Sequence, residues 1–138
     1  MIRNFTMEDY DEVYQLWKAT PGMGLRSLDD SREGIARFVR RNPNTNFVAV
    51  DGGSIIGAIL SGHDGRRGFL YHACVKPSCR RRSIGGELVG KVTEAMGQEG
   101  IIKLSLVCFS ENEPGNRFWE ALGWTKREEL NFYSFEIL

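Results

Sequence analysis

A strand-to-helix junction at residues 75–88 constrains the fold of this chain more than any other feature. The segment 69–75 (FLYHACV) is apolar and typical of a strand, and Pro77 stops it. Beyond a basic loop, apolar residues recur at helical spacing over 85–99, and Gly100 ends the pattern. Such a junction directs the free N–H groups of the helix start, and the positive end of the helix dipole, toward one point. The sequence therefore predicts an anion site there, with a phosphate as its expected occupant.

The loop itself carries residue types that suit a phosphate. Arg80, Arg81 and Arg82 offer charge-assisted hydrogen bonds to a pyrophosphate. Gly85 and Gly86 let an anion approach without Cβ atoms in the way. The pattern is neither a GxxxxGK[ST] loop nor a GxGxxG dinucleotide fingerprint. A basic surface loop before a glycine-started helix is the alternative interpretation.

The rest of the pattern predicts one α/β (α+β) domain over residues 1–138, with a mixed, mostly antiparallel sheet flanked by helices. A capping box at Thr6 and Asp9 opens an amphipathic helix. Turn signals join three strands into an antiparallel meander, and the next helix makes one parallel crossover. The expected order is β-α-α-β-β-β-α-β-α-β-β, with strands at 2–5, 47–50, 54–61, 69–75, 101–108, 124–128 and 132–137, and helices near 7–19, 29–41, 85–99 and 113–122.

Composition excludes several classes of protein. Lys+Arg and Asp+Glu both number 18, and a formal net charge of zero argues against a strongly basic nucleic-acid binder. There is no run of 18 apolar residues for a membrane span, and the N-terminus lacks a secretory apolar region. The 3 cysteines form no CxxC pair, so the sequence predicts neither a disulfide framework nor a metal site. A cytoplasmic location is the default expectation.

Two segments resemble one known family. The run Val75-x-Pro77-x-x-Arg80-x-x-Ser83-x-Gly85 resembles motif A of the GNAT superfamily of N-acetyltransferases, in which V-x-P precedes Q/R-x-x-G-x-G/A at the turn that holds the pyrophosphate of acetyl-CoA. Further on, the run FWEALGW, which ends at Trp124, is similar to the family's F/L-Y-E-x-L-G-F. The predicted element order also matches, so the resemblance implies the GNAT acyltransferase fold over essentially the whole chain.

The resemblance also implies a reaction and its partners. Acetyl-CoA would be the co-substrate, an amine would be the acceptor, and no metal, nucleic acid or membrane would take part; the protein would be a monomer or a homodimer. The pantetheine arm would pair with the backbone of the strand that ends at Val75, and the pyrophosphate would bind the loop. The implied cofactor-binding residues are Ala73, Cys74, Val75, Arg80, Arg81, Arg82, Ser83, Ile84, Gly85, Gly86 and Asn112.

Two positions depart from the family pattern. Ser83 stands where the motif has its first glycine; serine keeps the backbone N–H, and its hydroxyl could itself bond a phosphate oxygen. Trp119 stands where many members have the tyrosine that protonates the departing thiolate. An indole N–H is no acid at neutral pH, so that role does not transfer to this chain. The second departure motivates another hypothesis, a non-catalytic CoA-binding module of the same fold.

The base that would deprotonate the acceptor ammonium is left open. In members with a base on this strand, it lies four or six residues before the motif valine, which is Tyr71 or Phe69 here. Phe69 has no basic group, so Tyr71 is the candidate, with a pocket-wall tyrosine as the alternative. Strict alternation places Tyr71 on the face of Val75 and His72 on the opposite face. Tyr133 on the last predicted strand is a candidate acid.

The acceptor site is expected between residues 20–28, the tip of the closing hairpin near 128–131, and the fourth and fifth strands. Arg26 is a candidate for binding an acceptor carboxylate, and a solvated loop arginine is the favoured alternative. Nothing in these segments assigns the acceptor, so small-molecule and protein amines both stay open. A nucleic-acid binder that uses the arginine triplet and the arginines of the second helix is a third, weaker hypothesis.

Overall fold

The computed structural model describes residues 1–25 and 28–138, with only the backbone of Arg81. The chain forms two compact units, Met1–Val107 and Cys108–Leu138. Whether residues 1–138 act as one domain stays a prediction.

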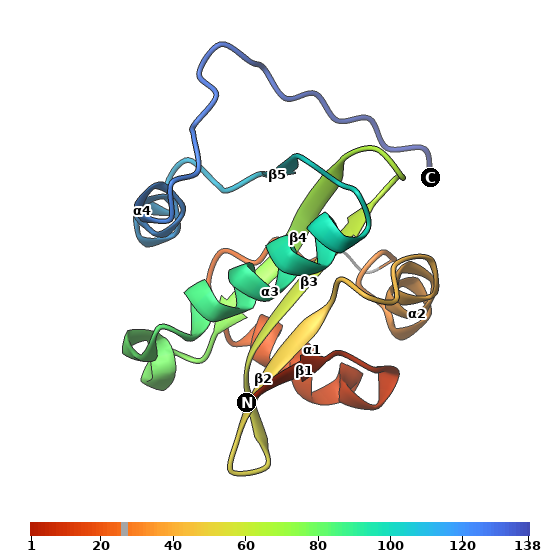
Figure 1. The fold of residues 1–138 in the computed structure, drawn as a ribbon, viewed down its shortest axis with the longest axis vertical. Coiled ribbons are helices and arrows are strands. Elements are labelled where there is room, and N and C mark those ends of the chain that lie inside the picture. The colour runs from red at the N-terminus through yellow and green to blue at the C-terminus, as the bar shows by residue number, and fades with distance from the viewer. Residues whose placement is uncertain (26–27) are drawn as a thin grey trace. The chain divides into compact units, whose positions relative to one another are not determined.

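The first unit is built on a five-stranded sheet in the order β1-β2-β3-β4-β5 (Figure 1). The first four strands pair antiparallel, and β4 pairs parallel with β5 across the crossover made by α3. The predicted class, a mixed and mostly antiparallel sheet flanked by helices, is confirmed. The strands are β1 (Ile2–Asn4), β2 (Phe47–Asp51), β3 (Ser54–His63), β4 (Gly68–Val75) and β5 (Leu104–Leu106), and the helices are α1 (Tyr10–Lys18), α2 (Arg32–Arg41) and α3 (Ile84–Gln98), with 3-10 turns η1 (Met7–Asp9) and η2 (Pro77–Arg82).

Helices cover both faces of this sheet. Trp17 of α1 and Ile35 of α2 share one buried cluster with Ala58 of β3, so both helices cover the same face. Leu88 of α3 lies at the opposite face, where its Cδ1 is 3.1 Å from the position a Cβ on Gly57 would take. Figure 1 shows α3 lying across this face of the sheet.

The predicted capping box at the N-terminus is confirmed. Thr6 N donates to Asp9 Oδ2 at 2.9 Å, and Arg3 donates to the two carboxylate oxygens of Asp9 at 2.8 and 2.9 Å. The hydrogen bond from Arg3 is the main reason why the pKa of Asp9 is lowered. A salt bridge therefore joins β1 to the start of the first helix.

A β-bulge at Tyr71 changes which side chains of β4 share a face. Leu60 of β3 pairs with His72, and its neighbour Ser61 pairs with Leu70, so Tyr71 is the extra residue. The Tyr71 ring packs against Phe38 of α2, with centroids 5.4 Å apart. The His72 ring packs against Trp17 of α1 at 4.8 Å.

The bulge overturns the predicted alternation along β4. Val75 pairs with Gly57, and a Cβ on Gly57 would point at Leu88 of α3. Val75 therefore lies on the α3 face. Tyr71 and His72 both lie on the face covered by α1 and α2. The prediction that Tyr71 shares the face of Val75 is wrong, because strict alternation assumes a regular ladder. The prediction that His72 lies on the face opposite Val75 is confirmed.

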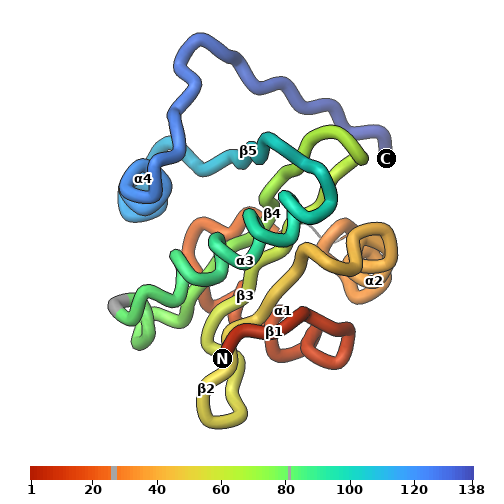
Figure 2. The backbone as a smooth tube through the Cα atoms, viewed as in Figure 1, coloured from red at the N-terminus to blue at the C-terminus, as the bar shows by residue number. Residues whose placement is uncertain are grey.

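The second unit differs from its predicted structure. Its helix is α4 (Glu113–Ala121), and residues 124–128 and 132–137 form no strand. In the first unit, the strand predicted over residues 101–108 is shorter than expected, because β5 spans only Leu104–Leu106. The backbone hydrogen bond described within residues 125–138 runs from Leu130 N to Arg127 O at 3.4 Å. Figure 2 shows this segment as an open trace, so the closing hairpin prediction is wrong for this structure.

Candidate functional site

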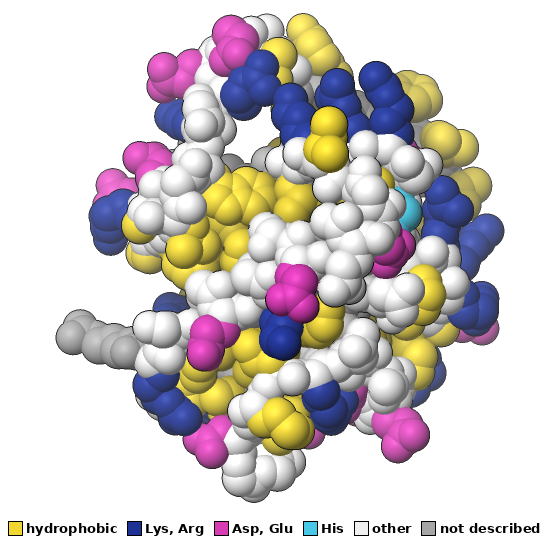
Figure 3. Space-filling model, viewed as in Figure 1, with side chains coloured by type: hydrophobic (Ala, Val, Ile, Leu, Met, Phe, Trp, Pro, Cys, Tyr) yellow, Lys and Arg dark blue, Asp and Glu magenta, His cyan; other side chains and the backbone are white. Residues whose placement is uncertain are grey.

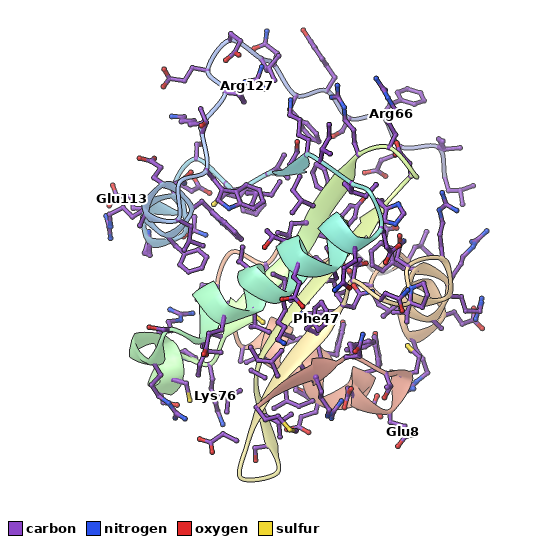
Figure 4. The ribbon with its side chains drawn as sticks, viewed as in Figure 1. Glu8, Phe47, Arg66, Lys76, Glu113 and Arg127 are labelled. Atoms are coloured by element: carbon purple, nitrogen blue, oxygen red, sulfur yellow. The ribbon has the colours of Figure 1, made fainter. Side chains whose placement is uncertain are left out.

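The predicted anion site lies where β4 passes through η2 into α3. Figure 4 labels Lys76 at this junction, between the last residue of β4 and the first of η2. Ser83 then precedes α3 with φ 61° and ψ 17°, the left-handed region. A residue with a Cβ adopts this region at a cost, whereas glycine adopts it freely. The backbone thus needs at Ser83 what the first motif glycine supplies.

The first turn of α3 leaves backbone donors available. Glu87 N donates to Ser83 O at 3.1 Å, as expected of an α-helix that begins at Ile84. The N–H groups of Ile84, Gly85 and Gly86 have no acceptor in the helical pattern, and the Ser83 side chain does not cap them. Gly85 and Gly86 are half-buried, and neither has a side chain that would stand between an anion and the backbone N–H groups. This arrangement fits an anion at the helix start.

Two arginines of the triplet brace this loop. Arg80 Nε donates to Val75 O at 3.2 Å, which ties η2 back to the end of β4. Arg82 forms a salt bridge of 2.7 Å with Asp51 at the end of β2. That hydrogen bond is the main cause of the lowered pKa of Asp51 and the raised pKa of Arg82. The side chain of Arg81 lies outside the described part of the chain.

The edge of β4 beside the loop is available for an extended partner. β5 pairs with β4 only over Gly68–Leu70, so the following part of β4 forms no ladder with β5. Along this part Ala73 is exposed and Val75 is half-buried. The Cys74 side chain points into the core, where burial raises the pKa of its thiol to about 12. The Cys74 thiol is therefore not available to a ligand at this edge.

The bulge presents an aromatic group on the opposite face. Tyr71 is 55% exposed and packs on Phe38 at 5.4 Å and on Phe69 at 4.8 Å. Burial, with a smaller effect of Asp64, raises the pKa of Tyr71. A phenol with a raised pKa stays protonated at neutral pH. It can donate a hydrogen bond or orient a water, but it is a poor base.

A further pair, which the sequence did not indicate, involves His72, the next residue of β4. His72 Nε2 is 2.7 Å from Asp30 Oδ1, and both side chains are nearly buried. The Tyr10 hydroxyl donates to the backbone oxygen of Asp30. Sequence reasoning missed the pair because the partners are 42 residues apart and no local spacing joins them.

The predicted residues of the second unit have local roles. Asn112 caps α4, where its Oδ1 accepts a hydrogen bond from Gly115 N at 3.0 Å. The Trp119 ring packs against Trp124, with centroids 5.0 Å apart. Tyr133 is 87% exposed and belongs to no helix or strand. Arg26 lies outside the described residues.

Residues 1–25 and 28–138 contain neither a metal-binding cluster nor a membrane-spanning helix. No group of three or more His, Cys, Asp or Glu side chains there is placed to hold a metal ion. No helix among them is long and apolar enough to cross a membrane.

Comparison with known proteins gives one family. The model of the acetyltransferase (GNAT) family matches residues 10–124. A protein named acetyltransferase from Sodalis glossinidius is 29% identical over 129 residues, which are 94% of this chain and 89% of that protein.

Solved structures show the same fold. Ard1 from Thermoplasma volcanium has a TM-score of 0.80 at 19% identity, over 91% of this chain and 82% of its own. PaiA N-acetyltransferase from Thermoplasma acidophilum, solved in complex with coenzyme A, has a TM-score of 0.75 at 20% identity, over 88% of this chain and 86% of its own. The predicted acyltransferase fold is confirmed.

Proposed function

Since the chain belongs to the acetyltransferase (GNAT) family, we propose that it transfers the acetyl group of acetyl-CoA to a primary amine of a small molecule or protein by direct attack. The observation that carries the proposal is the junction of β4 and α3. There, backbone donors of a helix start lie beside a strand edge that has no partner from β5. A pyrophosphate and an extended amide arm need these two features.

The residues of the first unit fit this co-substrate. The N–H groups of Ile84, Gly85 and Gly86 would bind the pyrophosphate, with the Ser83 hydroxyl as a further donor. The backbone of Ala73, Cys74 and Val75 would pair with the pantetheine amides. When bound, acetyl-CoA supplies the thioester that the amine attacks. Arg80 and Arg82 would hold the loop in place, because each already bonds to another part of the unit.

The acceptor ammonium must lose a proton before it attacks. Tyr71 is exposed, but its raised pKa keeps the phenol protonated. We therefore assign to Tyr71 the orientation of a water that takes this proton, and not the role of the base. Tyr133 as acid and Asn112 as a pantetheine contact rest on the sequence resemblance.

Gly85→Asp tests the cofactor site. The new carboxylate would face the bound pyrophosphate, so we expect CoA affinity to fall at least ten-fold in calorimetric titration. Gly90→Asp is the matched control, because Gly90 lies on the same helix with open space at its Cβ position. The control should bind CoA like the wild type. Equal CoA affinity in Gly85→Asp and the wild type would show that the loop is not the pyrophosphate site.

A non-catalytic CoA-binding module is the second candidate, and Trp119 favours it, since this residue replaces the usual acid. Incubation with acetyl-CoA and a panel of amines, read by release of free thiol, separates the two functions. Thiol release with any amine supports the acetyltransferase, and CoA binding without release supports the module. The cysteines of the described structure are free, in keeping with the proposed cytoplasmic location.

A further inference from the structure

We propose that the face of the sheet covered by α2 binds an acidic polypeptide segment, so that the acceptor is a peptide amine flanked by Asp or Glu. The inference rests on the proposed function, because it names the acceptor class of that reaction. Two sets of side chains form this surface. They are the aromatic group (Phe38, Phe69 and Tyr71) and the arginine group (Arg37 and Arg41 of α2, and Arg66 and Arg67 of the β3–β4 turn).

The two elements that carry the arginine group are fixed against each other. His63 N donates to Asn42 Oδ1 at 2.9 Å, which ties the end of β3 to the end of α2. The backbones approach closely here, because a Cβ on Gly62 would lie 2.6 Å from Asn42 Nδ2 and 2.9 Å from Phe38 Cε1. In the turn itself, Asp64 Oδ1 accepts from the backbone N–H groups of the two arginines at 2.8 Å each. The four guanidinium groups therefore start from one rigid support.

Helix geometry places Arg37 and Arg41 on the side of α2 that faces away from α1. Arg32 marks the opposite side, since it bonds to Asp11 of α1 at 2.6 Å and lies over the Tyr10 ring at 5.0 Å. At about 100° per residue, Arg37 and Arg41 point roughly 140° and 180° away from Arg32. Figure 4 labels Arg66 at the outer end of the β3–β4 turn, and Figure 3 shows Lys and Arg side chains over this turn and α2.

The charge of the arginine group is not neutralised by neighbouring acids. All four side chains are exposed, and none forms an ion pair with a described acidic residue, whereas Arg3, Arg32 and Arg82 each do. The nearby Asp64 uses its carboxylate on the backbone of the turn, and these bonds lower its pKa. Positive charges on two linked elements, without ion-pair partners among the described acidic residues, favour an anionic partner.

A peptide fits this surface better than a polynucleotide or a small acid. Bases stack on open ring faces, and the Tyr71 ring already packs on two other rings, those of Phe38 and Phe69, with centroids 5.4 and 4.8 Å apart. Because the arginines come from two elements, one carboxylate does not engage them all. A segment with several acidic residues does, and Tyr71 lies on the same strand as the proposed cofactor edge.

Acetylation of three matched peptides by the full chain tests the inference. The peptides share one amine and differ in flanks of Asp/Glu, Ser/Gly or Lys/Arg. We expect kcat/KM to be at least ten-fold higher for the acidic peptide than for the neutral one, with a KM that rises with salt. Arg41→Glu should raise this KM at least ten-fold and leave CoA affinity unchanged. Arg40→Glu, the matched control with the same charge change, points about 80° from Arg32 and should shift KM less than three-fold.

Peptide binding is also followed by fluorescence anisotropy of the labelled acidic peptide, with CoA present. Binding that Arg41→Glu weakens ten-fold supports the surface, even where no peptide or other amine releases thiol and the proposed function therefore fails. The inference is overturned if the protein does not prefer the acidic peptide over the neutral one in either assay. It is also overturned if Arg40→Glu and Arg41→Glu lose the same affinity for the acidic peptide. It is also overturned if single-stranded RNA displaces the labelled peptide and binds this surface more tightly than the acidic peptide does.

Discussion

Among single residues, Asp9 is a nearly buried charge with several hydrogen-bond partners. Its side chain is 8% exposed and accepts hydrogen bonds from Arg3 and from Thr6 N. Asp9→Asn should lower the free energy of unfolding at pH 7 by about 1–3 kcal/mol, because part-buried donors lose a charged acceptor. Urea unfolding followed by circular dichroism measures this change. Asp11→Asn is the control; its exposed ion pair with Arg32 should contribute less than about 1 kcal/mol.

The same carboxylate predicts a pH dependence. The pKa of Asp9 lies below its ordinary value of 3.8 in the folded chain, chiefly because of the Arg3 hydrogen bond. Its stabilisation is therefore fully present above the unfolded pKa and is lost as the pH falls through the folded pKa. The difference in unfolding free energy between wild type and Asp9→Asn should shrink as the pH drops below 3.8. A difference that stays constant down to strongly acidic pH would contradict this role.

Among the helices, α3 begins directly after a residue with a strained backbone conformation, Ser83. Ser83 is the one non-glycine residue with a positive φ in the described chain, and its hydroxyl forms no cap bond. Ser83→Gly should raise the free energy of unfolding by about 0.5–1 kcal/mol, since glycine avoids the left-handed cost but is less restricted when unfolded. Ser83→Ala keeps the Cβ and should change it little. Equal stabilisation by both substitutions would rule out backbone strain as the cause.

How much of each element could be predicted depends on where its signal lies. α1, α2, α3 and α4 follow from apolar spacing and caps within single segments, and the sequence indicated all four. The bulge at Tyr71 arises from the pairing of β4 with Leu60 and Ser61 of β3, and no residue type within β4 indicates it. The His72–Asp30 pair is hidden for the same reason. Local patterns therefore predicted the basic loop between β4 and α3 but placed Tyr71 of β4 on the wrong face.

Over the whole molecule, burial is concentrated in the first unit. Every buried residue of the described chain lies between Phe5 and Ile101, and α4 contributes none. Residues 132–137 alternate as a strand would, and Tyr133, Phe135 and Ile137 are 87–92% exposed. Alternation predicts a preference for strand, but a strand also needs a partner edge for its N–H and C=O groups. Partner choice is a property of the whole molecule, which explains why the absence of the closing hairpin could not be predicted from residues 124–137 alone.

Limited trypsin digestion should show this uneven burial. Lys126 and Arg127 lie in the open segment with exposed side chains, so we expect cleavage there first, as fragments ending at residue 126 or 127 in mass spectra. Arg37 and Arg40, held in α2, should be cut much later. Early cleavage in α2 with an intact segment after residue 124 would mean that this segment is protected by pairing.

With CoA added, the same digestion tests the proposed pyrophosphate site at η2 and the start of α3. Arg80 and Arg82 are exposed in η2, so trypsin should reach this turn in the free protein. Ligand binding stabilises only the state that binds it, and a pyrophosphate at the start of α3 would hold η2 against local opening. We expect cleavage after the arginine triplet to slow at least five-fold with saturating CoA, while cleavage at Lys126 and Arg127 keeps its rate. Equal slowing at both places would indicate general inhibition of the protease, and no slowing at the triplet would separate CoA from this loop.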